Sequence, residues 1–250
     1  MSKAVLSIGT THPWNIAGVG LDACVVREHG MRPLTVIAAV SAQDAAGVHA
    51  VHAIPTEVLV AELDAIPDVA AVRVGAVGDE WNARAVTWWL ERRAVPVVID
   101  PVMNATLGGR LADTATIAAL LPAASRAGAV LTPNAEEASI LTGTTIASVG
   151  DMHTAAEDLR SRGIRNVLIK GHLTATDDVV DVLAYAQGVK EFHGRRLPQS
   201  MRGTGCTIAA ALACALAADY EIVEAVERAR RYVRAKIAAQ TTFENLNVAF

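Results

Sequence analysis

The sequence predicts an α/β fold with a mostly parallel central sheet and helices on both faces. Short runs rich in Val, Ile and Leu alternate with longer alanine-rich stretches of helical period, which is the pattern of βαβ crossovers. Hydrophobic residues make up 52% of the 250 residues and aromatic residues only 4%, so aliphatic strands should pack under alanine-rich helices. This length suits one large core, and we expect a single domain over residues 1–250.

Six parallel strands are expected, each nearly all apolar because both of its faces are buried. In order, they are residues 5–9, 34–41, 71–75, 96–102, 129–132 and 166–170. Helices should fill the gaps between them. In such sheets ligands bind beyond the carboxyl ends of the strands, so the residues that close the strands are the first candidates for a site.

The last third of the chain changes pattern. Residues 179–186 and 190–197 flank Gln187-Gly188 and predict an antiparallel hairpin at the edge of the sheet. Residues 203–217 and 222–240 then predict two consecutive helices, the second with Arg and Glu at the spacing of a solvated face.

Charge and cysteine content exclude several classes of protein. A net charge of −4 provides no basic field for nucleic acid. Three cysteines, Cys24, Cys206 and Cys214, have neither zinc-site spacing nor disulfide density, so reduced thiols are expected. No apolar run reaches the roughly 18 residues of a membrane helix. We expect a soluble cytoplasmic protein with no nucleic acid or membrane partner.

Arg202-Gly203-Thr204-Gly205-Cys206-Thr207 precedes an alanine-rich helix and predicts an anion site. The glycines let backbone N–H groups converge, and the helix start adds its positive dipole end. Such a loop can stabilise a phosphoryl group in transfer. At the helix start the Cys206 thiol should have a lowered pKa and could accept a substrate proton. In isolation, an ordinary loop with Cys206 as a small buried hydrophobe is the alternative.

Together, four motifs at strand ends resemble the hydroxymethylpyrimidine and phosphomethylpyrimidine kinases of thiamine synthesis, which are ribokinase-like. The motifs are this loop, Asp100-Pro101-Val102-Met103, Thr132-Pro133-Asn134-Ala135-Glu136-Glu137-Ala138 and Val167-Leu168-Ile169-Lys170-Gly171-His172. The resemblance runs from end to end, and it implies ATP and Mg²⁺ as cofactors and a homodimer.

The resemblance also implies a nucleotide and metal side of the site. Asn134 and Glu137 match an Asn-x-x-Glu motif that organises Mg²⁺ through waters, and Lys170 matches a lysine near the nucleotide phosphates. Asp100 would assist Glu137, because magnesium takes few carboxylates and a carboxylate that closes a buried strand needs a partner. Asn134 could also cap a helix, and Lys170 could simply extend from a strand end into solvent.

On the substrate side, Gln43 matches a glutamine that hydrogen-bonds the aminopyrimidine ring. Gly9, Ala17, Asp22 and Val102 match residues that line the pocket. An amide and a carboxylate suit a ring that offers both donors and acceptors. For Asp22 alone, a charge on the first helix is the simpler interpretation.

Several positions depart from the family pattern, most of them around the acceptor. The first loop contains Trp14 and Asn15 in place of a Gly-Gly pair, and Trp14 could stack on the ring, occupy its space or cap the core. Ala76 replaces a methionine, Thr106 a lysine and Arg202 a histidine. Arg202 could neutralise the γ-phosphate or hold the phosphate of a phosphorylated substrate.

The sequence therefore predicts an ATP-dependent kinase for 4-amino-5-hydroxymethyl-2-methylpyrimidine, its monophosphate, or both. The nearest alternative is a pyridoxal or pyridoxine kinase, since that ring is of similar size and also bears a hydroxymethyl group. A catalytically silent ligand-binding paralogue is a third hypothesis. The presence of Asp100, Glu137, Lys170 and Cys206 argues against it, because a pure binder needs neither metal nor base.

Overall fold

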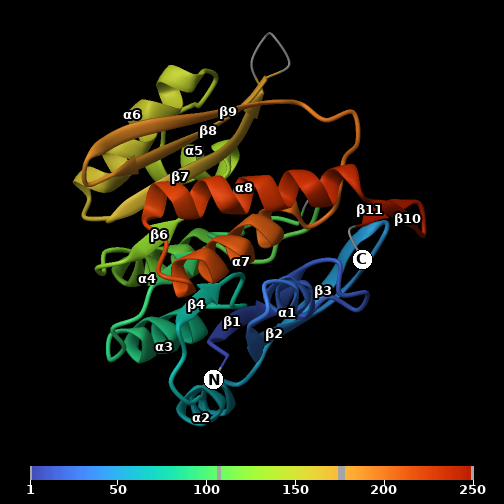
Figure 1. Cartoon of the computed structure of the whole chain (residues 1–250). Helices are drawn as coiled ribbons and strands as arrows, with labels where there is room; N and C mark the ends of the chain where they lie inside the picture. Colours follow the sequence, from blue (N-terminus) through green and yellow to red (C-terminus); the bar gives the residue numbers. More distant parts are fainter. Residues whose placement is uncertain (1, 106–107, 174–177, 249–250) are drawn as a thin grey trace.

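The computed structural model describes residues 2–105, 108–173 and 178–248. Over these residues nine strands form one sheet in the order β3-β2-β1-β4-β5-β6-β7-β8-β9 (Figure 1). The pairs from β2 to β7 are all parallel, as expected. These strands are β1 (Ala4–Thr10), β2 (Arg32–Asp44), β4 (Ala71–Val74), β5 (Val97–Ile99), β6 (Ala129–Leu131) and β7 (Asn166–Leu173). Their carboxyl ends lie along one edge of the sheet.

Both edges of the sheet are antiparallel. The predicted hairpin is confirmed as β8 (Asp178–Tyr185) and β9 (Gly188–Arg195), and β8 pairs antiparallel with β7. At the other edge β3 (Gly47–Ala53), which we did not predict, folds back on β2 through a turn at Asp44 to Gly47. Its two histidines and half-exposed positions lack the continuous apolar run of the central strands.

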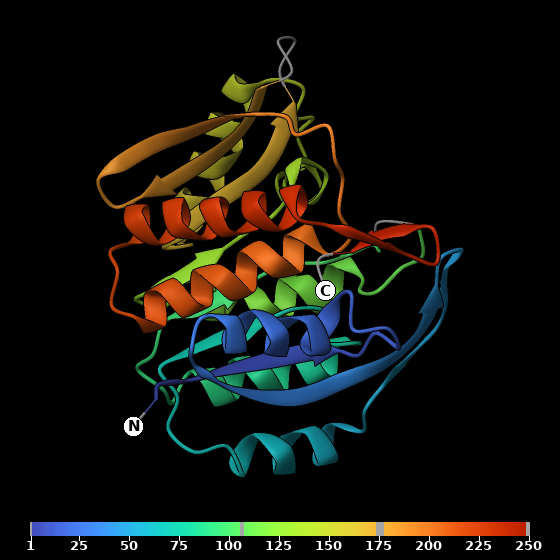
Figure 2. The ribbon, with the colours of Figure 1, turned by 45° about the vertical axis from the view of Figure 1, so that its right-hand side comes forward.

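Helices cover both faces of the sheet, and Figure 2 shows the two layers from the side. One face carries α1 (Gly18–Glu28), α7 (Thr204–Ala217) and α8 (Ile222–Ala238), which pack on one buried cluster. The other face carries α2 (Thr56–Asp64), α3 (Glu80–Leu90), α4 (Thr114–Ala124), α5 (Ala135–Thr142) and α6 (Val149–Ser161), packed on a second cluster. Among the described helices none is long and apolar enough to cross a bilayer.

Alternate strand residues supply the two cores. Val97 and Ile99 of β5 belong to the cluster under α2 to α6, and Val98 between them belongs to the cluster under α1, α7 and α8. Alanine fills most of the buried face of α7, which lets that helix lie close to the strands. This packing fixes the start of α7 over the carboxyl ends of the parallel strands.

A C-terminal hairpin, also not predicted, is formed by β10 (Thr241–Phe243) and β11 (Leu246–Val248). It joins two segments that are far apart in sequence. The Arg202 N–H donates to the Asn247 carbonyl at 2.8 Å, and the Phe243 ring meets the Trp14 ring edge-on at 5.5 Å between centroids. The first loop, Arg202 and the C-terminal hairpin thus form one structural unit.

Candidate active site

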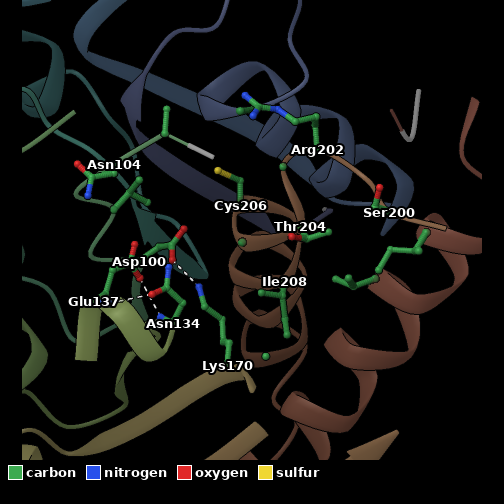
Figure 3. A pocket seen from close by; sticks show the side chains of 18 of the residues that line it. Asp100, Asn104, Asn134, Glu137, Lys170, Ser200, Arg202, Thr204, Cys206 and Ile208 are labelled. Carbon is green, nitrogen blue, oxygen red and sulfur yellow. Dashed lines mark hydrogen bonds and ion pairs between the residues drawn. The ribbon is translucent and has the colours of Figure 1, made fainter. Parts of the chain in front are cut away.

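A cavity of about 710 Å³ lies at the carboxyl ends of the parallel strands, beneath the start of α7. Its volume is in the usual range for ligand sites. Figure 3 shows Asp100, Asn134, Glu137 and Lys170 on one wall and Thr204, Cys206 and Ile208 of α7 on the other. Twelve of the predicted residues line it: Ala17, Gln43, Asp100, Val102, Asn134, Glu137, Lys170, Arg202, Gly203, Thr204, Gly205 and Cys206.

Asp100 is the centre of the charged wall, the name we use for Arg73, Asp100, Glu137 and Lys170. It follows β5 directly and is 1% exposed. Lys170 Nζ lies 2.7 Å from Oδ1, and Arg73 Nη2 lies 2.9 Å from Oδ2. Burial opposes the charge of Asp100, but Lys170 and Arg73 hold its pKa below the usual value. A carboxylate is thus stable at the end of a fully buried strand.

Arg73 is a charged cavity residue that the sequence reasoning missed. It lies in the middle of the apolar strand β4 and is 1% exposed, yet it lines the cavity. Its Nη1 lies 3.1 Å from Asp22 Oδ2, so the guanidinium joins two buried carboxylates. A side chain at Gly75 would overlap this guanidinium. One charged residue in an otherwise apolar strand, two positions before a glycine, was the available sequence clue.

Asp22 lies behind the cavity wall rather than on it. It is fully buried on α1, and burial raises its pKa to about 7, with Arg73 as the main opposing charge. Asp22 is absent from the lining residues, so it reaches the site through Arg73. Direct contact of Asp22 with a substrate stays a prediction that this position does not favour.

Asn134 and Glu137 form a capping box at the start of α5. The Glu137 N–H donates to Asn134 Oδ1 and the Asn134 N–H donates to Glu137 Oε2, both at 2.8 Å. The cap role expected for Asn134 is therefore confirmed, and the box aims both side chains at the cavity. Burial and the charge of Asp100 raise the pKa of Glu137 to about 7, against the effect of Lys170.

Lys170 stays charged in spite of its burial. Burial alone would lower its pKa, but Asp100 and Glu137 raise it above the usual value. Its backbone N–H donates to the Pro133 carbonyl at 2.9 Å, which fixes the end of β7 beside the start of α5. The ammonium therefore faces the cavity from a fixed position.

The glycine loop, residues 203–206, forms the opposite wall. Gly203 is the N-cap of α7 with φ +75°, and an added Cβ would overlap the Ile16 carbonyl oxygen, so only glycine fits. No side chain caps this helix start, which leaves the first-turn N–H groups for a ligand. A Cβ placed on Gly205 would lie 3.7 Å from Lys170 Nζ. The start of α7 therefore lies close to the charged wall.

Cys206 lines the cavity, but the lowered thiol pKa that we expected is wrong. Burial raises its pKa, and Arg73 is the largest opposing influence. Desolvation is the largest influence on this thiol. Cys214, further along α7, is buried and lies outside the cavity lining.

Arg202 lies on the acceptor side of the cavity, near His12. Its Nε and Nη1 atoms are buried without a hydrogen-bond partner in the described part of the chain, and so is His12 Nε2. Burial and the charge of Arg202 lower the pKa of His12 to about 4, so His12 is neutral at pH 7. Buried donors without partners point to an additional ligand or water at this position.

The remaining residues that were predicted to bind the substrate separate into two groups. Gln43, Ala17 and Val102 line the cavity, and Gln43 Nε2 donates to Ser41 Oγ at 2.7 Å. Gly9 and Trp14 do not line it: Trp14 is half-buried against Phe243. Ala76 is a lining residue, and Thr106 lies outside the described residues.

The donor set suits magnesium better than a metal held by protein alone. Among the described residues, no group of three or more His, Cys, Asp or Glu could hold a metal ion. Magnesium keeps several waters and needs few carboxylates, and Asp100 and Glu137 both face the cavity. Burial is the main cause of the raised pKa of Glu137 and the charge of Asp100 adds to it, so a cation held by these two carboxylates would oppose both effects.

The raised pKa of Glu137 predicts a pH-dependent stability. The folded chain keeps this proton up to about pH 7, whereas the unfolded chain releases it near pH 4.5. The stabilisation is therefore complete below pH 4.5 and lost as the pH rises through 7. Glu137→Gln should flatten, without abolishing, the fall in urea midpoint over this range, because Asp22 contributes in the same direction. Glu136→Gln, an exposed neighbour, is the control; an unchanged slope in Glu137→Gln would contradict the assignment.

Comparisons with known proteins identify the family of this chain. A family model described as phosphomethylpyrimidine kinase matches residues 15–249. The hydroxymethylpyrimidine/phosphomethylpyrimidine kinase of Rhizobium meliloti is 32% identical over 249 residues, which cover 98% of this chain and 94% of the relative.

Two solved structures share the fold. The phosphomethylpyrimidine kinase of Clostridium difficile has a TM-score of 0.79 at 27% identity, covering 93% of this chain and 98% of that chain. The pyridoxal kinase of Staphylococcus aureus, in complex with AMP-PCP and pyridoxal, has a TM-score of 0.88 at 25% identity, covering 99% and 93%. The ribokinase-like fold is therefore confirmed, and the chain belongs to the phosphomethylpyrimidine kinase family of phosphotransferases.

Proposed function

We propose that this chain transfers the γ-phosphate of ATP to 4-amino-5-hydroxymethyl-2-methylpyrimidine and to its monophosphate, in thiamine biosynthesis. The carrying observation is the cavity in which the uncapped glycine loop and Cys206 face Asp100 and Lys170. Converging amides opposite a fixed ammonium form the environment that a moving phosphoryl group requires. Family membership supports the same reaction.

The nucleotide side of this proposal uses the charged wall. Lys170 and the amides of the glycine loop bind phosphate oxygens, and Asn134 fixes the orientation of Glu137 through the capping box. Asp100 and Glu137 would hold Mg²⁺ together with waters and phosphate oxygens. When bound, this ion neutralises charge on the phosphates.

The acceptor side of the proposal uses Gln43, Ala17 and Val102 around the ring. The thiolate form of Cys206 accepts the proton of the substrate hydroxyl and becomes the thiol, as the hydroxyl oxygen attacks phosphorus. Burial raises the pKa of Cys206, so formation of the thiolate depends on the positive charge of Arg73 and on the first turn of α7. Asp22 sets the position of Arg73.

A pyridoxal or pyridoxine kinase is the second candidate. The observation that favours it is the similarity to the Staphylococcus aureus pyridoxal kinase, which extends over nearly the whole chain. Trp14 lies outside the cavity lining and Ala76 lies in it, so the reshaped wall leaves space for either ring.

We also propose that residues 1–250 act as one domain in a cytoplasmic homodimer.

An ATP-consumption assay with Mg²⁺ tests the function. Hydroxymethylpyrimidine, its monophosphate and pyridoxal are offered in parallel. We expect turnover of both pyrimidines and a loss of about 100-fold or more in Cys206→Ala, the scale of a lost proton acceptor. Cys214→Ala on the same helix should keep the wild-type rate.

Turnover of pyridoxal alone would replace the leading function by the second. Absence of turnover with every acceptor, alongside measurable ATP binding, would contradict both. It would favour the third hypothesis, a ligand-binding paralogue.

For Arg202 we propose contact with the phosphate of the monophosphate acceptor. Of the two roles expected, its position beside His12 and Cys206 favours this one over the γ-phosphate. Arg202→Met should lower kcat/KM for the monophosphate by about 10-fold or more, while the unphosphorylated alcohol loses less than about 3-fold. Arg202→Lys keeps the charge and should recover part of the loss. Equal losses for both acceptors would assign Arg202 to the γ-phosphate, and no loss with either would remove both roles.

A further inference from the structure

The backbone directly after Lys170 is irregular. Pairing of β7 with β8 shifts between Ile169 and His172, and Gly171 has φ +72°, a left-handed conformation that glycine adopts readily. The irregularity removes Gly171 from the regular ladder between the strands. Its N–H therefore needs another acceptor.

Asp181 of β8 supplies that acceptor with its side chain. The Gly171 N–H donates to Asp181 Oδ1 at 2.5 Å. Arg230 of α8 donates through Nε to Asp181 Oδ2 at 2.6 Å, so both carboxylate oxygens are already engaged within the protein. Asp181 is only 6% exposed. The carboxylate thus holds the turn after Lys170 and is itself held by a helix.

Arg230 is fixed in turn by the edge strand. Its Nη2 donates to the Phe192 carbonyl of β9 at 2.9 Å. A chain of contacts therefore runs from β9 through Arg230 and Asp181 to the Gly171 turn. On the side of β6, the backbone of Lys170 is fixed by the hydrogen bond that its N–H donates to the Pro133 carbonyl. The lysine is held from two directions.

A contribution to stability alone does not explain the buried ion pair of Asp181 and Arg230. Burying an ion pair costs desolvation energy, and well-packed apolar residues often stabilise an interior equally well. What an apolar pair cannot provide is a directed acceptor for one N–H beside the cavity. We therefore expect Asp181 and Arg230 to serve mainly to fix the backbone at Gly171 and less to stabilise the fold.

We propose that Asp181, held by Arg230, is a positioning residue for phosphoryl transfer: it fixes the Gly171 turn so that Lys170 keeps its place beside Asp100 and the nucleotide phosphates. This rests on the proposed function in that Lys170 contacts the phosphates. Asp181 acts through Lys170 and not on the acceptor.

The test compares Asp181→Ala, which removes the acceptor, with Asp181→Asn, whose amide oxygen can still accept from Gly171. Glu227→Gln is the matched control, because Glu227 also joins α8 to β9, through Lys190 Nζ at 2.9 Å, but lies outside the cavity lining. Arg230→Gln is a second route to a loosened carboxylate if Asp181→Ala does not fold. The readouts are amide hydrogen exchange of Gly171 without ligands, AMP-PCP affinity by calorimetry, and kcat with the KM of ATP and acceptor.

For Asp181→Ala we expect Gly171 exchange faster by about 10-fold, AMP-PCP affinity weaker by several-fold, and kcat lower by about 10- to 100-fold, since small displacements at a reacting centre cost this much. The acceptor KM should stay within about 3-fold of wild type. Asp181→Asn has one acceptor oxygen for two donors, so it should fall between wild type and Asp181→Ala. Glu227→Gln should remain near wild type in every readout, and Arg230→Gln should shift the readouts in the direction of Asp181→Ala.

Two results would overturn the proposal. One is faster Gly171 exchange with unchanged AMP-PCP affinity and kcat, since the turn then does not position Lys170. The other is an equal loss in Asp181→Asn or Glu227→Gln, since the effect then comes from the docking of α8. If the wild type phosphorylates no acceptor, the proposed function fails, while exchange and AMP-PCP affinity still decide the role of Asp181.

Discussion

The site depends on one buried carboxylate. Asp100 directly follows the central strand β5 and is buried from solvent. It remains charged because Arg73 and Lys170 each contact one of its carboxylate oxygens. Removing either cation would leave an uncompensated charge in the interior, which is a costly arrangement. The same pair of contacts orients Lys170 toward the glycine loop, places Arg73 next to Cys206 and links α1 to the sheet through Asp22. Fold stability and site geometry therefore rest on the same few contacts.

The two sides of the cavity differ in how they are held. The charged wall is fixed by buried strand ends and by the capping box of Asn134 and Glu137. The side proposed for the acceptor is built from the first loop, Arg202 and the C-terminal hairpin, joined by a backbone hydrogen bond and a ring contact. The departures at Trp14 and Arg202 both fall on this side, against the C-terminal hairpin.

Much of the fold and part of the site could be predicted from sequence. The buried parallel strands gave continuous apolar runs, and residues at their ends, such as Asp100 and Lys170, were correctly expected at one edge of the sheet. The edge strand β3 was missed because its weakly apolar sequence gains its pairing only from β2. Arg73 was missed because its partners Asp22 and Asp100 are distant in sequence, and only the folded chain shows that an arginine within an apolar strand is neutralised on both sides. The predicted pKa shift of Cys206 was wrong because burial, which sequence does not give, is the largest influence on this thiol and raises its pKa.

The most direct test of this account is the equilibrium unfolding of Arg73→Met in urea, together with its MgATP turnover. The account predicts a loss of about 3 to 5 kcal/mol in the free energy of unfolding, because two buried carboxylates lose a partner, and a partial recovery when Asp22→Asn is added. Turnover should fall in both variants, because Asp100 and Cys206 lose a neighbouring charge. An Arg73→Met chain as stable and active as the wild type would show that the Asp100 network does not hold the site together.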